Sequence, residues 1–192
     1  MVRGYFGMGV LGISKAMNVG SLLRSAHAFG ASFVFTIAAA YARGEGKLAD
    51  TSDTPGSVPF YEFASLADFR LPVGCSLVGI ELTDEAIDLP RFRHPTSCAY
   101  VLGAERTSLP PEFLARCEHV VKIPTRFSLN LALAGALVMY DRVLSLGGYP
   151  LRPTRPGGAP MPMTRTVFGP PRYGRNKGKR PAKGRGTAAK GE

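Results

Sequence analysis

The sequence predicts an α/β fold in which helices flank a mostly parallel sheet. Short apolar runs alternate with amphipathic segments of helical length, which is the pattern of successive strand–helix units. The 192 residues, 45% of them hydrophobic and 20% charged, suffice for one core of ordinary domain size but not for two full domains. The longest strongly apolar run, residues 131–140, has ten residues, against the roughly 20 that a membrane span needs. We therefore expect one α/β domain and no membrane-spanning segment.

The strands are predicted from apolar and β-branched runs bounded by turn residues. They cover residues 4–10, 32–37, 75–82, 98–103 and 120–123. The segment 41–61 is rich in Gly, Asp, Ser and Pro, and we predict that it forms a long surface loop.

The helices are predicted from apolar residues at helical spacing. We expect long helices over 19–29 and 128–146, a short helix near 65–70 and another that begins near Pro110. Gly30 stands where a left-handed cap would end the first long helix, and Gly147, Gly148 and Pro150 are expected to end the second.

The net charge lies at the C-terminus. Residues 1–150 contain 13 basic and 13 acidic residues, whereas residues 151–192 contain 11 basic residues and one acidic residue, so this tail carries the whole net charge of +10. The tail also has 8 Gly and 7 Pro and few large apolar side chains, a composition that cannot offset the entropy cost of ordering. We predict a folded domain over 1–150 and a disordered basic tail over 151–192.

Three segments place polar side chains where strands end or helices begin. In the first, Asn18 and Gly20 are expected at a strand-to-helix turn, where an amide can cap free N–H groups and a glycine lets a ligand approach the backbone. Arg24 would lie opposite the apolar stripe of the helix that follows. An ordinary amphipathic helix with a solvated arginine has the same pattern.

The other two segments follow later strands. Gly103 ends an apolar strand and Glu105 lies just beyond it, on the side where open α/β sheets bind ligands, although an acidic residue there is more often a helix-start charge or an exposed group. Ser128 and Asn130 stand in the first turn of the last helix. Ser128 suits a cap, while Asn130 would be costly to bury without hydrogen-bond partners.

The order and combination of these segments resemble the three motifs of SpoU/TrmH RNA 2′-O-methyltransferases in the SPOUT superfamily. Motif 1 is matched by Asn18, Gly20, Ser21, Arg24, Ser25 and Ala26, motif 2 by Gly103, Glu105 and Leu109, and motif 3 by Ser128, Leu129 and Asn130. Ser108 stands where motif 2 usually has glycine, which is a departure from the family pattern. The resemblance spans residues 4–146.

The resemblance implies a C-terminal trefoil knot, a homodimer built on the first and last helices, and S-adenosylmethionine as the cofactor. The implied cofactor-binding residues are Leu102, Gly103, Glu105, Leu109, Ile123, Ser128 and Leu129. The implied catalytic residues are Arg24, Asn18, Glu105, Ser128 and Asn130.

The implied reaction is methylation of a ribose 2′-hydroxyl in RNA. Methyl transfer requires in-line alignment, so positioning should be the main contribution. The guanidinium of Arg24 is very rarely neutral in proteins, so it suits orienting a phosphate and stabilising the developing alkoxide better than acting as a general base. We favour tRNA over rRNA as the substrate, because the body resembles relatives without an extra folded RNA-binding domain.

In this interpretation the tail is a second contact to RNA. Its basic residues Arg172, Arg175, Lys177, Lys179 and Arg180 would displace counterions from phosphates. A solubilising extension without a fixed partner is the alternative for the tail. For the whole chain, the alternative is a non-catalytic RNA-binding protein of the same fold, which would not bind S-adenosylmethionine.

Other functions are disfavoured by patterns that the sequence lacks. No GxGxxG follows a predicted strand, which argues against a dinucleotide-dependent oxidoreductase. His27, His94 and His119 have no metal-ligand spacing, so no metal is expected. The three cysteines form no CxxC pair and the N-terminus shows no convincing export segment, so we expect reduced thiols and a cytoplasmic location.

Overall fold

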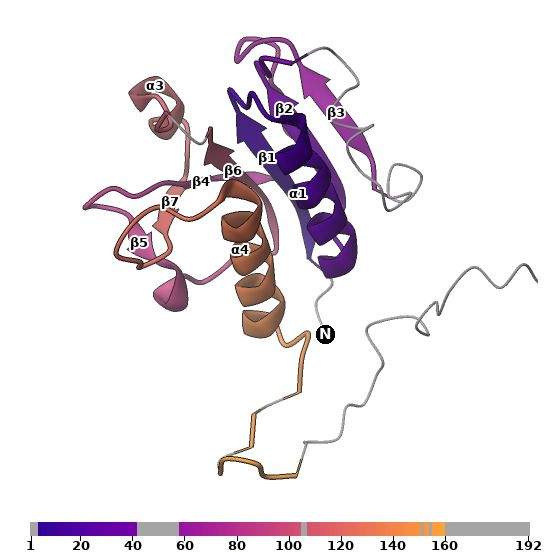
Figure 1. The fold of residues 1–192 in the computed structure, drawn as a ribbon, viewed down its shortest axis with the longest axis vertical. Helices are drawn as coiled ribbons and strands as arrows, with labels where there is room; N and C mark the ends of the chain where they lie inside the picture. The colour runs from indigo at the N-terminus through magenta and orange to yellow at the C-terminus, as the bar shows by residue number, and fades with distance from the viewer. Residues whose placement is uncertain (1–3, 42–57, 105–106, 151, 154, 160–192) are drawn as a thin grey trace, which may run out of the picture. The chain divides into compact units, whose positions relative to one another are not determined.

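The computed structural model describes residues 4–41, 58–104, 107–150, 152–153 and 155–159. These residues form a seven-stranded sheet in the order β3-β2-β1-β6-β4-β7-β5, in which each pair of neighbouring strands is parallel (Figure 1). The predicted α/β class with a mostly parallel sheet is therefore confirmed. All of its strands and helices belong to one unit of the chain, Met1–Met161.

The strands are β1 (Tyr5–Leu11), β2 (Phe33–Ile37), β3 (Phe60–Phe63), β4 (Ser76–Ile80), β5 (Ile87–Asp88), β6 (Ser97–Gly103) and β7 (His119–Lys122). The helices are α1 (Ala16–Phe29), the short α3 (Pro111–Leu114) and α4 (Leu131–Ser145), with one 3-10 turn, η2 (Leu89–Arg91). The five predicted strands and both long helices are present with shifted ends, whereas β3 and β5 are additional. β3 begins inside the segment predicted as the loop 41–61, much of which lies outside the described residues.

The helix predicted near 65–70 is wrong, because this segment consists of bends and turns. The hydroxyl of Ser65 donates to the carboxylate of Asp68 at 2.7 Å, and Arg70 donates to the backbone carbonyls of Ala67 and Phe69. The two Arg70 bonds occupy backbone carbonyls that a helix would otherwise use.

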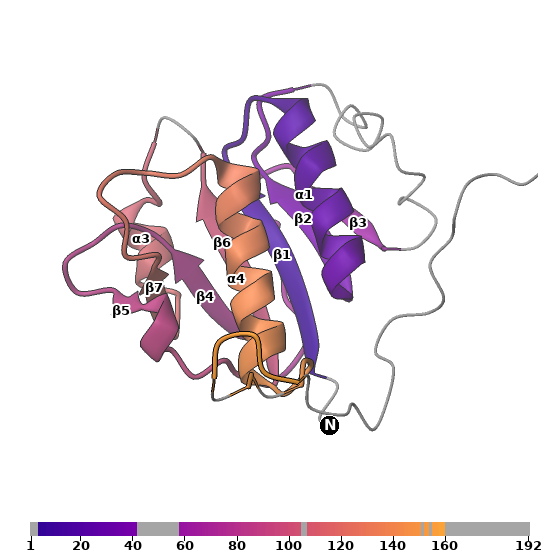
Figure 2. The ribbon, with the colours of Figure 1, turned by 60° about the horizontal axis from the view of Figure 1, so that its bottom comes forward.

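Helices α1 and α4 lie side by side on one face of the sheet (Figures 1 and 2). Phe6, Met8 and Val10 of β1 belong to the core cluster that also contains buried residues of both helices. The two helices approach closely at Gly135, because a Cβ there would overlap Leu22 of α1. This helical layer holds the start of α4 beside the carboxyl end of the sheet.

A second, aromatic cluster contains Phe33 and Phe35 of β2 together with Phe69 and Phe113. A Cβ at Gly7 would overlap the ring of Phe33, and a Cβ at Gly9 would overlap the ring of Phe35. Glycine is a poor strand former, but at positions 7 and 9 the missing side chain leaves room for the rings of Phe33 and Phe35 against β1. The glycines therefore mark close packing and do not interrupt the strand.

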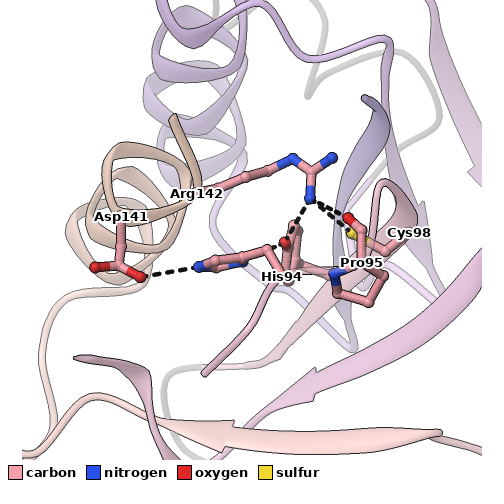
Figure 3. A network of polar contacts seen from close by, with 6 residues as sticks. His94, Pro95, Cys98, Asp141 and Arg142 are labelled. Atoms are coloured by element: carbon pink, nitrogen blue, oxygen red, sulfur yellow. Dashed lines mark hydrogen bonds and ion pairs between the residues drawn. The ribbon is translucent and has the colours of Figure 1, made fainter. Parts of the chain in front are cut away.

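A buried polar network joins α4 to the segment before β6 (Figure 3). The Arg142 side chain, 2% exposed, donates to the backbone carbonyls of Pro95 and Thr96 and to the hydroxyl of Tyr100. Its guanidinium carbon also lies 4.9 Å from the centre of the Phe6 ring. We call the four side chains His94, Tyr100, Asp141 and Arg142 the α4 clasp.

The proton positions in the α4 clasp follow from its contacts. Burial raises the pKa of the Tyr100 phenol, so this group keeps its proton, and it already accepts a hydrogen bond from Arg142. The carboxylate of Asp141 can only accept, so Nε2–H of His94 donates to it at 2.9 Å, and in the neutral ring Nδ1 then accepts from the Tyr100 hydroxyl at 2.6 Å. Burial lowers the pKa of His94 and outweighs the opposing effect of Asp141, which agrees with this neutral tautomer.

Candidate functional site

A cavity of about 600 Å³ lies at the carboxyl ends of β4, β6 and β7, beside the start of α4. Because the strands are parallel, their carboxyl ends meet at one edge of the sheet, where ligands of such folds bind. The strand ends contribute Ile80, Glu81, Leu82, Leu102, Gly103, Ala104, Lys122 and Ile123. The loops and helices contribute Lys15, Thr107, Ser108, Thr125, Ser128, Leu129, Asn130, Leu131 and Ala134.

The loop from β7 to α4 forms one wall and is shaped by its own polar side chains. The hydroxyl of Thr125 lies 2.9 Å from the carbonyl oxygen of Phe127 and 3.3 Å from that of Ile123. Asn130 Oδ1 accepts hydrogen bonds from the N–H groups of Ala132 at 3.0 Å and Leu133 at 3.3 Å. Asn130 is therefore the cap of α4, so the prediction that this helix begins at Ser128 is wrong by three residues.

Residues 107–109, between β6 and α3, form the facing wall. The N–H of Leu109 donates to Oε2 of Glu81 at 2.7 Å, and the N–H of Leu82 donates to Oε1 at 2.9 Å. Gly103 lies under this loop, since a Cβ there would be 3.0 Å from the carbonyl oxygen of Thr107. A larger residue at 103 would push the loop away.

Serine is accommodated at position 108, where motif 2 usually has glycine. In the part of the chain that the structure describes, Ala38 is the non-glycine residue with positive φ, at 49°. Ser108 thus has a backbone conformation that L-residues adopt without strain. The backbone at position 108 therefore does not require glycine.

Two lysines and one carboxylate surround the cavity. Lys122 is fixed by hydrogen bonds of 3.1 Å to the backbone carbonyls of Thr83 and Asp84. Lys15 precedes α1, and Glu81 faces the cavity from the end of β4. The cavity thus offers both signs of charge together with apolar side chains such as Leu102 and Leu131.

The expected turn at Asn18 and Gly20 is wrong, because both residues lie inside α1. The helix already begins at Ala16, with Lys15 in extended conformation before it, and the N–H of Asn18 donates to the carbonyl of Lys15. Arg24 is exposed on α1, nine residues beyond Lys15, which places it about 13 Å along the helix axis. Neither Asn18 nor Arg24 lines the cavity.

A comparison with protein-family models identifies the chain. The model of the SpoU rRNA Methylase family matches residues 8–140. The chain belongs to the SpoU rRNA methylase family. The matched range begins within β1 and includes the whole cavity and most of α4, so the predicted resemblance is confirmed.

Individual SpoU-like proteins are also similar. The tRNA (guanosine(18)-2′-O)-methyltransferase TARBP1 of Mus musculus is 26% identical over 150 residues, which are 67% of this chain, and the chain spans 9% of that protein's length. A solved structure described as "Structural insights into the 2-OH methylation of C/U34 on tRNA" is 27% identical with a TM-score of 0.67, covering 76% of this chain and 99% of the other. The SpoU methyltransferase AviRb of Streptomyces viridochromogenes, in complex with AdoMet, is 24% identical with a TM-score of 0.66, covering 76% of this chain and 59% of AviRb; this likeness shows the fold.

Within one chain, residues of SpoU motifs 2 and 3 lie together at the cavity, whereas those of motif 1 do not. Five residues expected to bind the cofactor line the cavity: Leu102, Gly103, Ile123, Ser128 and Leu129. Leu109 is buried behind the wall, and Asn130 lines the cavity while it caps α4. The motif 1 residues lie on α1, apart from the cavity.

Several expected site residues lie outside the described residues. These are Glu105 and the tail residues Arg172, Arg175, Lys177, Lys179 and Arg180. Within the described ranges, no helix has the length and apolar character for crossing a membrane, and no three His, Cys, Asp or Glu side chains are grouped as metal ligands would be.

Three charged residues of the cavity wall, Lys15, Glu81 and Lys122, were missed by the sequence analysis. Glu81 follows an apolar strand just as Glu105 does, and Lys122 ends another strand. The rule that ligands bind at the carboxyl ends of parallel strands would have identified both.

Proposed function

We propose that the protein is an S-adenosylmethionine-dependent RNA methyltransferase that methylates a ribose 2′-hydroxyl, with tRNA as the favoured substrate. One observation carries the proposal: the segments of SpoU motifs 2 and 3, distant in sequence, form facing walls of one cavity at the carboxyl edge of the sheet. The two similar proteins at 26% and 27% identity are both described in terms of tRNA 2′-hydroxyl methylation. rRNA is the alternative substrate.

The cavity fits the proposed cofactor. Its volume of about 600 Å³ lies within the usual range for small-molecule sites. S-adenosylmethionine, when bound, supplies a methyl group activated by a positively charged sulfonium. Lys15 and Lys122 offer positive charge to a ligand that carries a carboxylate, while Leu102 and Leu131 offer apolar contact. Leu102, Gly103, Ile123, Ser128 and Leu129 would hold the cofactor, with Leu109 and Glu105 supporting the loop.

We propose that the protein acts as a homodimer through the outer surface of α1 and α4. Met17, Leu133, Leu137 and Tyr140 are large hydrophobic residues exposed on these helices, with exposed fractions of 79%, 51%, 36% and 40%. Leu133, Leu137 and Tyr140 are spaced so that they form one stripe on α4. A contiguous apolar surface of this kind is typical of an interface.

The dimer would also complete the site. Arg24 lies seven residues after Met17, so the two share a face of α1. Because Arg24 is too far along α1 to reach the cavity of its own chain, we propose that it serves the cavity of the second copy. There its guanidinium would orient the RNA phosphate and stabilise the developing alkoxide, with Asn18, Ser128 and Asn130 ordering the surrounding backbone.

Two further features belong to the proposal. A C-terminal trefoil knot is supported by the order of the elements, since β7 lies beyond β4 whereas the α4 that follows it returns to contact α1. The basic tail would add sequence-independent contacts to RNA phosphates through Arg172, Arg175, Lys177, Lys179 and Arg180. We retain a cytoplasmic location as part of the proposal.

The test is methyl transfer to purified tRNA and rRNA, followed by nucleoside mass spectrometry. We expect 2′-O-methylated nucleosides in tRNA with the wild-type protein and none with Gly103→Val, whose side chain would displace the loop over the cavity. Methylation confined to rRNA would establish the alternative substrate. No methylation, together with no calorimetric binding of S-adenosylhomocysteine, would instead indicate a non-catalytic RNA-binding protein.

A further inference from the structure

We propose that Glu81 is a positioning residue of the cofactor site, whose carboxylate fixes the backbone of residues 107–109 and thereby sets the affinity for the cofactor. The inference rests on the proposed function for the identity of the ligand. It assigns a role to a residue outside the three motifs, which directly follows the strand β4.

Glu81 connects three walls of the cavity. Its backbone N–H donates to the carbonyl of Val121 at 3.0 Å, which joins the end of β4 to the end of β7. Its Oε2 accepts from the N–H of Leu109 at 2.7 Å, across 28 residues of sequence, and its Oε1 accepts from the N–H of Leu82 at 2.9 Å. One residue therefore fixes the relative positions of β4, β7 and the loop from β6.

The loop has two attachments at Leu109. The Leu109 side chain is 3% exposed and belongs to the aromatic cluster, where a Cβ at Gly79 would lie 3.5 Å from its Cδ1. Its N–H is held from the opposite direction by Glu81. The side chain fixes where Leu109 sits in the core, and the carboxylate fixes how its backbone turns toward the cavity.

The adjoining residues Thr107 and Ser108 are those that line the cavity. Gly103 lies directly beneath them, since a Cβ there would be 3.3 Å from the Leu109 nitrogen and 3.5 Å from Glu81 Oε2. Without the carboxylate, the Leu109 N–H would lose a charge-assisted bond, and the loop could settle toward Gly103. That movement would narrow the space between the two facing walls of the cavity.

The substitution Glu81→Gln isolates this role because it keeps the shape of the side chain. A glutamine amide has one acceptor oxygen, so it can accept from Leu82 or from Leu109, while its NH₂ group faces the other N–H. Glu118→Gln is the matched control. The carboxylate of Glu118 accepts from the hydroxyl of Ser76 at 2.8 Å, at the opposite end of β4 and outside the cavity.

Calorimetry measures the Kd for S-adenosylhomocysteine, and steady-state assays measure kcat and the KM for S-adenosylmethionine. Both use the chain with all 192 residues. For Glu81→Gln we expect Kd and the KM for S-adenosylmethionine to rise about ten-fold, while kcat at saturating cofactor changes less than about two-fold. Glu118→Gln should match the wild type in all three. Faster hydrogen exchange at the Leu109 amide, measured without cofactor, should accompany the Glu81 change alone.

The outcomes separate the two proposals. If the wild type binds S-adenosylhomocysteine and Glu81→Gln binds it equally well, the role of Glu81 is overturned while the proposed function stands. A kcat that falls as much as KM rises would equally overturn a positioning role. If the wild type itself binds no S-adenosylhomocysteine, the proposed function fails, and the inference fails with it.

Discussion

His94 and Asp141 form a partly buried pair, with Nε2 of His94 2.9 Å from Oδ2 of Asp141, although 47 residues separate them in sequence. The pair belongs to the α4 clasp, which joins the last helix to the segment before β6. The clasp lies at the amino end of β6, whereas the cavity lies at its carboxyl end. The position of α4, and with it the wall that α4 gives the cavity, thus depends on contacts made at its far end.

The stability of the protein should decrease in mild acid because of His94. Its pKa is lowered in the folded state, so the unfolded chain binds a proton more readily, and the stability present above about pH 6.5 is lost as the pH falls toward the folded-state pKa. Urea unfolding at pH 7.5 and at successively lower pH values measures this loss. His94→Gln should be less stable at pH 7.5 but should show a weaker pH dependence, whereas exposed His27→Gln should behave as the wild type. An unchanged pH dependence in His94→Gln would exclude His94 as its source.

The close packing of Gly9 against Phe35 predicts a destabilising substitution that a second change relieves. Gly9→Ala should cost about 1–3 kcal/mol, because the added methyl group overlaps the ring. Phe35→Leu alone should also destabilise, since it opens a gap in the aromatic cluster. In a double-mutant cycle by urea unfolding, the pair should lose less than the sum of the single changes. Simple additivity would mean that the methyl group and the ring do not meet.

The apolar stripe on α4 predicts the oligomeric state. Light scattering with size exclusion should give a dimer for the wild type and a monomer for Leu137→Glu, because the change places a charge within the proposed interface. Val73→Glu is the control, since Val73 is fully exposed in the turn before β4, away from both helices. A Leu137→Glu protein that remains dimeric would place the interface elsewhere.

The proposed action of Arg24 in the second copy predicts complementation between two inactive proteins. Arg24→Ala should keep S-adenosylhomocysteine binding but lose most methyl transfer, about 100-fold or more, and Gly103→Val should lose binding. Mixed dimers of the two contain one intact cavity facing one intact Arg24, so activity should reappear on mixing. If Arg24 acts on the cavity of its own chain, every site in the mixture keeps a defect, and the mixture stays inactive.

The sequence was sufficient to predict five strands that are consecutive in the sheet, β2, β1, β6, β4 and β7. β1, β2, β4 and β6 are apolar runs that are buried on both faces over most of their length, so their composition alone distinguishes them. β7 is only half-buried, and it was predicted from its β-branched pair Val120 and Val121. β3 and β5 escaped prediction because they lie at the two edges of the sheet, where burial is partial and the pattern is weak.

The site was harder to predict than the fold, since its geometry depends on where helices begin. Asn18 was expected in a turn because Asn and Gly are common before helices, yet α1 already begins at Ala16, directly after the extended residue Lys15. Asn130 stands out in the sequence as a polar residue in an apolar run, but its role as a double acceptor at the cap of α4 depends on the course of the loop before the helix. The bond from Glu81 to Leu109 joins residues 28 apart, and no local pattern encodes such a contact.

The walls of the cavity extend along the chain from Lys15 to Ala134. During synthesis, therefore, a nascent chain cannot acquire the complete pocket until α4 has emerged from the ribosome and docked, after nearly all of the sheet already exists. Ligand binding would therefore appear only in the last stage of folding. A translation product arrested before residue 131 contains the strand sequences but should not bind the ligand.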